Sequence, residues 1–198
     1  MTTKFEKAIE LIDAANSKDP NIETSDGKEW PKELLYSHRM SDMIERYRPD
    51  ADDVMKLAMR AQHIERWKSS RSDYPMDRKG YFQWRIALYT YHAETAAKLL
   101  AEAGYDEAFI ERMKLAVSKK SLKHNPDTQL LEDVTAMVFI EHYMQAFADK
   151  HPEYSEEKWL EIIRKTWKKM TDNGHQFVLD GKVTLPEPLV PLIQKALS

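Results

Sequence analysis

The chain has no cysteine and only five glycines among its 198 residues. The absence of cysteine excludes disulfides, thiolate metal sites and a cysteine nucleophile. The scattered glycines form neither a phosphate-binding loop, nor a dinucleotide fingerprint, nor the turn that exposes a nucleophilic serine. The formal net charge of −3 provides no broad basic surface, which excludes a nucleic acid polymer as the expected partner.

Long apolar runs are also missing from the sequence. No run approaches the roughly 18 residues that a membrane-spanning helix needs. The segment Met1–Glu6 lacks the apolar core of a secretory signal. We therefore expect a cytoplasmic protein with no membrane partner.

Apolar side chains recur with helical period along almost the whole chain, as they do from Val54 to Ile64. We predict an all-α, single-domain bundle of about six or seven helices over residues 1–198, with 171–198 as a C-terminal extension. A weak strand pattern occurs at Phe177–Leu179 and is interpreted as a hairpin edge. The expected helices begin near Phe5 and cover about 31–47, 54–64, 81–103, 107–117, 126–148 and 156–170.

Four residues stand in a spaced series: His38, His63, His92 and Asp133. Their order resembles the ligand order of the HD phosphohydrolase superfamily, although Ile64 stands where such an enzyme has aspartate. The resemblance implies an HD-like fold in which the four residues bind one divalent metal that activates water. Nitrogen and carboxylate ligands suit Mn, Fe, Co, Ni or Zn.

Asp133 shares a helical stripe with Leu130, Met137, Ile140 and Met144, a pattern that faces a core. A carboxylate in a core is costly unless it is paired, hydrogen-bonded or bound to metal. One interpretation is a metal ligand or catalytic group. The other is a buried aspartate that pairs with an arginine or caps a neighbouring helix.

His92 follows Arg85 by two helical turns on the same face. This pairing suits an anionic ligand, because arginine binds phosphate or carboxylate through two nitrogens. The alternative is a half-buried histidine that bonds a backbone carbonyl.

His38 and His63 lie opposite the apolar faces of their predicted helices. They are exposed if each helix buries one face, and they line a polar cavity if both faces are covered. Glu65 is a candidate substitute for the missing aspartate only if the helix ends near His63, because positions i and i+2 diverge by about 200°. Glu132 is a second candidate substitute.

Residues 66–85 contain four arginines and two lysines interleaved with two tryptophans and two tyrosines. Arginine binds oxyanions and stacks on aromatic rings, and aromatic faces stack on bases. One hypothesis is a pocket for a phosphate-bearing small molecule; the other is a solvated loop that pins two helices. The candidate substrate-binding residues are Arg66, Arg71, Arg78, Arg85, Trp67 and Tyr74.

A long combined motif resembles the family named domain of unknown function 4202. The resemblance covers the chain from Phe5 to the final helix and implies a bacterial-type cytoplasmic protein, but it supplies no reaction. The segments that carry it are Leu35–Ser41, Gln62–Trp67, Arg71, Tyr74–Pro75, Arg78, Gly80–Tyr81, Trp84–Arg85, His92–Ala93, Leu131–Asp133 and Lys165–Met170.

The leading functional hypothesis is a metal-dependent, HD-like phosphohydrolase that acts on a small phosphorylated molecule or nucleotide. Asp133, His92 and Glu65 are its candidate catalytic residues. Ile64 favours the alternative, a non-catalytic nucleotide- or anion-binding module with a degenerate HD-like site. A third interpretation is a helical scaffold that forms a homodimer through the apolar stripe of residues 159–170. A di-iron bundle is disfavoured, because the chain lacks the required Glu-x-x-His pairs.

Overall fold

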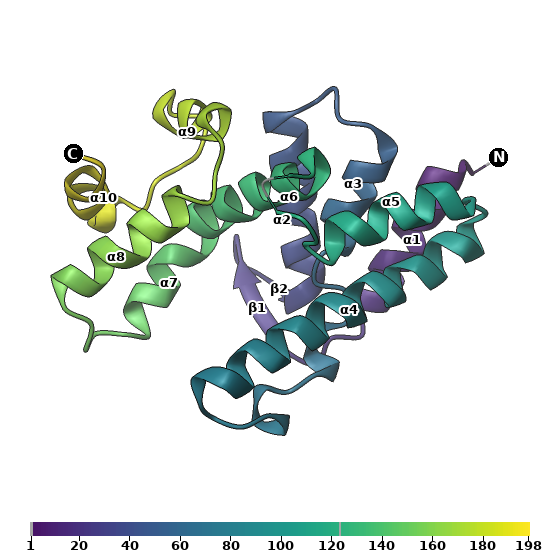
Figure 1. Cartoon of the computed structure of the whole chain (residues 1–198), viewed down its shortest axis with the longest axis horizontal. Coiled ribbons are helices and arrows are strands. Elements are labelled where there is room, and N and C mark those ends of the chain that lie inside the picture. Colours follow the sequence, from purple (N-terminus) through teal and green to yellow (C-terminus); the bar gives the residue numbers. More distant parts are fainter. Residues whose placement is uncertain (1, 123) are drawn as a thin grey trace. The chain divides into compact units, whose positions relative to one another are not determined.

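A computed structural model describes residues 2–122 and 124–198, and most of these residues are helical (Figure 1). The all-α prediction is confirmed at this level. The described residues form ten α-helices rather than six or seven, together with one small two-stranded sheet. By its internal contacts the chain divides into two compact units, residues 1–131 and 132–198. A single domain with a C-terminal extension stays a prediction.

The first unit carries two strands and most of the longer helices. Its elements are α1 (Lys4–Asn16), β1 (Ile22–Ser25), β2 (Lys28–Pro31), α2 (Lys32–Tyr47), α3 (Asp53–Ala61), the short 3-10 helices η1 (Arg66–Lys68) and η2 (Arg71–Asp73), α4 (Arg78–Ala103) and α5 (Glu107–Val117). The division falls within α6 (Pro126–Val138). The second unit continues with the π-helical segment η3 (Phe139–Tyr143), α7 (Met144–Asp149), α8 (Glu156–Trp167), α9 (Asp172–Leu179), the 3-10 helix η4 (Glu187–Leu189) and α10 (Val190–Leu197).

Several helix boundaries are set by capping side chains. The Asp106 side chain accepts a hydrogen bond from the backbone N–H of Phe109 and starts α5. Ser155 caps α8 in the same way. Gly104 ends α4 with φ +94°, a left-handed conformation that glycine adopts without strain. These three boundaries confirm the predicted ones.

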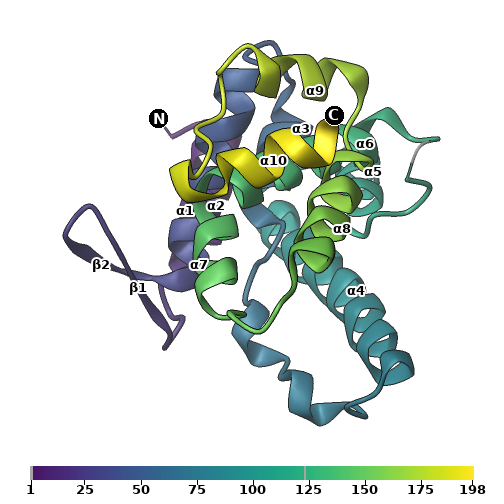
Figure 2. The ribbon, with the colours of Figure 1, turned by 90° about the vertical axis from the view of Figure 1, so that its left-hand side faces the viewer.

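The β1–β2 hairpin is absent from the sequence prediction. Its turn is Asp26–Gly27, and both residues have positive φ. An Asp-Gly pair is the usual two-residue hairpin turn, so the signal was present but short. Figure 2 shows the hairpin projecting beside the start of α2. The interpretation of Phe177–Leu179 as a strand edge is wrong, because these residues close helix α9.

The core of the first unit forms where α1 and α5 each pack on both α3 and α4, and α2 packs on α3. Its fully buried side chains include Ile12, Met40, Leu57, Leu100 and Met113. Burial of each contributes about 1.5–3 kcal/mol before the entropy of ordering is subtracted. This packing holds α2, α3 and α4 around the candidate site.

The second unit buries the predicted apolar stripe of α8 internally. Trp159 and Ile163 are buried, and α8 packs against α10, which buries Ile193. The homodimer stays a prediction. Among the described residues, no helix has the length and apolar character needed to cross a membrane.

Candidate functional site

The turn that follows α3 sets the direction of the His63 side chain. Helix α3 ends at Ala61, and Glu65 adopts a left-handed conformation with φ 51°. The Glu65 backbone N–H donates to the Asn16 side-chain oxygen at 3.0 Å. Because the helix has ended, helical periodicity does not set the direction of the His63 side chain. Ile64 is fully buried.

His92 of α4 is buried, with 2% exposure. Its Nδ1 lies 2.8 Å from the carbonyl oxygen of Ile64, which can only accept a hydrogen bond. Nδ1 therefore carries the proton, and Nε2 presents a lone pair. Nε2 is buried and has no hydrogen-bond partner among the described residues. Burial, and then the neighbouring His63, lower the pKa of His92 to about 3, so the ring is neutral.

His63 lies beside His92, with 5.8 Å between the ring centroids. It stacks on Tyr36 at 4.1 Å, and its side chain is 23% exposed. Burial, followed by the positive charge of Arg66, holds the pKa of His63 well below its usual range. The site thus contains two neutral imidazoles.

Glu33, in the first turn of α2, is the third member of this group. Its Oε2 lies 3.5 Å from Nδ1 of His63, and its Oε1 lies 3.9 Å from Nε of Arg66. The residue is 6% exposed, and its backbone N–H donates to the buried Asp19 carboxylate. Burial raises the pKa of Glu33 to about 7, while the nearby Arg66 opposes this rise.

The sequence prediction missed Glu33. An acidic residue in the first turn of a helix is ordinary, because it interacts favourably with the helix dipole. The available signal was spacing: Glu33 precedes Tyr36 by three positions and Met40 by seven, so it continues the buried stripe of α2.

Positive side chains gather around the imidazoles. Arg66, Lys119, Arg85 and Lys32 each lower the pKa of His63. Within the part of the chain that the structure describes, Glu33 is the carboxylate in ion-pair range of Arg66. The charge around His63 is therefore predominantly positive.

Aromatic rings hold three of these cations in place. The Arg66 guanidinium lies over Trp84 at 5.1 Å. Arg85 lies over the Tyr89 ring at 5.1 Å and donates to its hydroxyl at 2.6 Å. Lys119, with φ 54°, lies over the same ring at 5.8 Å. Rings attract cations without neutralising their charge.

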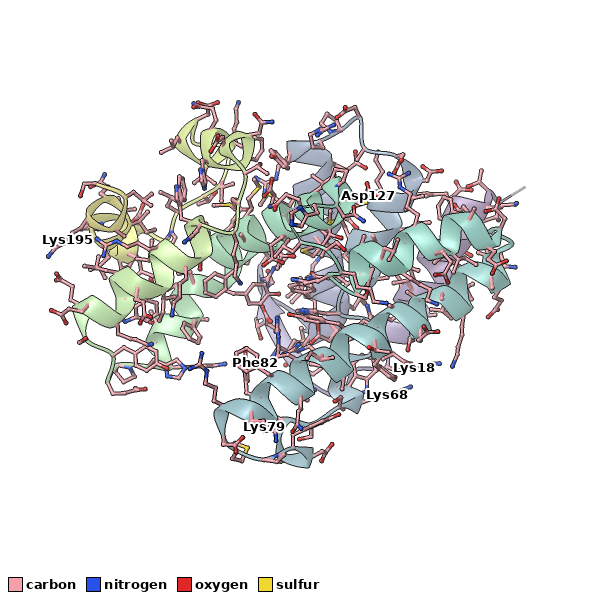
Figure 3. The ribbon with its side chains drawn as sticks, in the orientation of Figure 1. Lys18, Lys68, Lys79, Phe82, Asp127 and Lys195 are labelled. Carbon is pink, nitrogen blue, oxygen red and sulfur yellow. The ribbon has the colours of Figure 1, made fainter. Side chains whose placement is uncertain are left out.

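The other two arginines of the segment, Arg71 and Arg78, make contacts within it. Arg71 donates to the carbonyls of Tyr74 and Asp77, both at 3.1 Å. Arg78 lies over Phe82, which Figure 3 labels near the start of α4. Trp67 and Tyr74 are half-buried. Arg66 and Arg85 thus lie near the histidines. Arg71 instead stabilises the loop by bonding its backbone carbonyls.

The Glu65 carboxylate bonds to groups other than the two imidazoles. Its carboxylate accepts a hydrogen bond from the Tyr91 hydroxyl at 2.8 Å and pairs with Lys68 at 2.7 Å. Burial alone raises its pKa, but the hydrogen bonds from Lys68 and Tyr91 outweigh this and lower it. Glu65 is therefore a carboxylate at neutral pH.

The described contacts of His38 are with Asp13 and Trp30. Its Nε2 lies 3.8 Å from Asp13, and its ring lies 5.4 Å from that of Trp30. Arg60 binds the same Asp13 carboxylate through two hydrogen bonds of 2.7 and 2.6 Å. Burial, followed by the charge of Arg60, lowers the pKa of His38.

Asp133 belongs to the second unit. Its carboxylate accepts hydrogen bonds from the Thr171 backbone N–H at 2.9 Å and hydroxyl at 2.6 Å. A Cβ on Gly174 would lie 3.3 Å from this carboxylate. Glu132 lies 3.4 Å from Lys169. Asp133 thus braces Thr171, the residue that caps α9, and its role as a metal ligand or catalytic group stays a prediction.

The metal set predicted from the sequence is His38, His63, His92 and Asp133. Among residues 2–122 and 124–198, no three histidine, aspartate or glutamate side chains form a group that could hold a metal ion. The metal roles of these four residues stay predictions.

A family model described as "Domain of unknown function (DUF4202)" matches residues 6–193. The chain belongs to this family. No curated protein and no solved structure matches it. The DUF4202 match therefore confirms the resemblance seen in the sequence, and the function has to be argued from the site.

Proposed function

We propose that this DUF4202 protein binds a small phosphorylated molecule or nucleotide between His63, His92, Arg66 and Arg85. The observation that carries the proposal is the cluster of cations around two neutral imidazoles, one of which has a buried nitrogen with no hydrogen-bond partner in the described part of the chain. Arginine favours phosphate because its planar group forms two parallel hydrogen bonds to an oxyanion. The nearby rings of Trp84 and Tyr89 pack against Arg66 and Arg85.

The free nitrogen of His92 narrows the class of ligand. Nε2 presents a lone pair, so it needs a hydrogen-bond donor, which an unprotonated phosphate lacks. A ligand that carries a hydroxyl or N–H group beside its phosphate satisfies both His92 and the arginines. Sugar phosphates and nucleotides have this combination.

Strain in the backbone supports a functional role for the same region. Among the described residues, Glu65 and Lys119 are two of the four non-glycine residues with positive φ. Glu65 lies two positions after His63, and Lys119 lies over the Tyr89 ring. Such conformations cost free energy and cluster at functional sites.

Ligand binding is tested by melting the protein with inorganic phosphate, ribose 5-phosphate and AMP. A ligand at 100 times its Kd stabilises the folded state by about 2.7 kcal/mol. Arg85→Met should raise the Kd at least tenfold, about 1.4 kcal/mol. Arg48→Met is the matched control, because Arg48 is half-exposed and pairs with Asp50. Absence of stabilisation by all three compounds would contradict the proposal.

A metal-dependent, HD-like phosphohydrolase is the second candidate. It is favoured by the hydrogen bond from His92 Nδ1 to a backbone carbonyl, an arrangement common among metal-ligating histidines. Its test is elemental analysis of freshly purified protein, with phosphate release measured before and after addition of Mn. Ligand binding without metal and without phosphate release would favour the non-catalytic binding module over the phosphohydrolase.

A further inference from the structure

Exposed apolar side chains gather at the start of helix α4, in residues 74–86, which we call the α4 tip. Among the described residues, seven large hydrophobic side chains are exposed, and four of them belong to this tip: Met76 (78%), Tyr81 (43%), Phe82 (50%) and Ile86 (63%). The rings of Tyr81 and Phe82 are 5.7 Å apart, and Ile86 lies one helical turn after Phe82. Single exposed hydrophobic residues are ordinary, whereas a contiguous group marks an interaction surface.

Two cations share the helical face of this apolar group. At 100° per residue, Arg78, Phe82, Ile86 and Lys79 fall within an arc of about 100°. The Arg78 guanidinium lies over the Phe82 ring at 5.8 Å. In the part of the chain that the structure describes, neither Arg78 nor Lys79 has a carboxylate in ion-pair range. The face is therefore both apolar and positively charged.

The acidic residues of the segment do not neutralise these cations. Asp73 and Asp77 accept hydrogen bonds from the backbone N–H groups of Ser70 and Gly80. Residues 66–86 contain six basic and two acidic side chains, a net charge of +4. Because the whole chain carries −3, the other residues together carry −7. The charge of this segment is thus opposite to that of the rest of the protein.

The loop that precedes α4 is fixed against the helix. A Cβ on Gly80 would lie 2.0 Å from the Pro75 carbonyl oxygen, so only glycine allows this close approach. Arg71 donates to the carbonyls of Tyr74 and Asp77 and holds the other side of the loop. In Figure 2, η2 and the start of α4 extend below the other elements of the first unit. The α4 tip is therefore a preformed projection, which lowers the entropy cost of docking.

Charge and shape together select one class of partner. A second copy of the same surface would meet it with like charge, which disfavours a symmetric dimer through the tip. A projection provides no groove for the amphipathic helix of an acidic protein. An anionic bilayer is continuous and deformable, attracts arginine and lysine, and takes up apolar side chains at the level of its headgroups.

We propose that the α4 tip docks the protein on an anionic membrane surface. Met76, Phe82 and Ile86 enter the headgroup region, and Arg78 and Lys79 contact lipid phosphates. A long apolar run is needed to cross a bilayer but not to lie on its surface, so this docking departs from the sequence-based expectation of no membrane partner. The inference is independent of the anion binding proposed at His63 and His92.

Cosedimentation with vesicles tests the proposal. The vesicles are made of phosphatidylcholine alone or of an equal mixture of phosphatidylcholine and phosphatidylserine. We expect the wild type to bind the mixed vesicles, to dissociate from them as the salt concentration rises, and to bind phosphatidylcholine at least tenfold more weakly. Absence of binding to the mixed vesicles at low salt overturns the proposal and favours an acidic protein as the partner. Equal binding to both vesicles also overturns it, because the cations then contribute nothing.

Single substitutions assign the binding to the α4 tip. Lys79→Gln should weaken binding to the mixed vesicles about fivefold, whereas Lys98→Gln, at an exposed position on the same helix, should leave it unchanged. Ile86→Gln should weaken binding about tenfold, and Leu179→Gln is its matched control, because Leu179 is 65% exposed outside the tip.

Thermal melting checks that each variant is folded, which the exposure of these positions leads us to expect. If Ile86→Gln does not fold, Lys79→Gln still tests the assignment. Unchanged vesicle binding by folded Lys79→Gln and Ile86→Gln would assign the binding to another surface and overturn the inference.

Discussion

Replacement of Glu33 by glutamine should change how stability depends on pH, even without ligand. The pKa of the carboxyl rises from 4.5 to about 7 on folding, mainly because of burial. The folded state therefore holds more protons than the unfolded state between these values. The contribution of Glu33 to stability is fully present below pH 4.5 and is lost as pH rises through about 7.

The magnitude follows from the size of the shift. One pKa unit corresponds to 1.36 kcal/mol, and integration from pH 5 to pH 8 gives a loss of about 2.5 kcal/mol in wild type. His92 acts in the opposite direction, because its pKa falls to about 3 on folding and its contribution is lost on acidification. Wild-type stability alone mixes these effects, so the informative quantity is the difference between Glu33→Gln and wild type at each pH.

Urea denaturation at pH 5, 6, 7 and 8 measures this difference. We expect Glu33→Gln to gain about 2.5 kcal/mol relative to wild type across the range. Glu94→Gln, whose side chain is exposed, should show a nearly constant difference. A constant difference for Glu33→Gln would refute the assignment of a protonated, buried carboxyl.

Three further substitutions test the packing described above by urea denaturation. Gly104→Ala should lose about 1 kcal/mol or more, because its φ of +94° strains any side chain; an unchanged midpoint would contradict the left-handed cap. Thr171→Val removes the hydroxyl that bonds Asp133 and should cost about 1–3 kcal/mol, whereas Thr171→Ser should retain most of the stability. Asp13→Asn leaves the buried Arg60 without its charged partner and should cost about 2–4 kcal/mol; a loss below 0.5 kcal/mol would show that Asp13 contributes little.

Long amphipathic helices were predictable from the sequence, because their apolar pattern repeats over many positions and capping residues mark their ends. The boundaries at Gly104, Asp106 and Ser155 agree with the structure. The hairpin was missed because each strand has only four residues. The strand interpretation of Phe177–Leu179 was wrong because three apolar residues do not distinguish a strand from the end of a short helix.

The candidate site was predictable only in part. His63, His92, Arg66 and Arg85 were selected because of residue type and spacing, and the structure places them together. The partners of Arg71 are backbone carbonyls, which no sequence pattern specifies. Local sequence patterns predict which face of a helix a side chain occupies. They do not predict which residue, distant in the sequence, that side chain contacts.

The hydrogen bond from His92 to the Ile64 carbonyl has a consequence for folding. It joins positions 28 residues apart, and the bond between Glu65 and Asn16 joins positions 49 apart. Closing such loops costs conformational entropy before the contacts that offset this cost can form. Both bonds require α1, α3 and α4 to be docked, so affinity for the proposed ligand depends on the tertiary packing of the first unit rather than on its helix content.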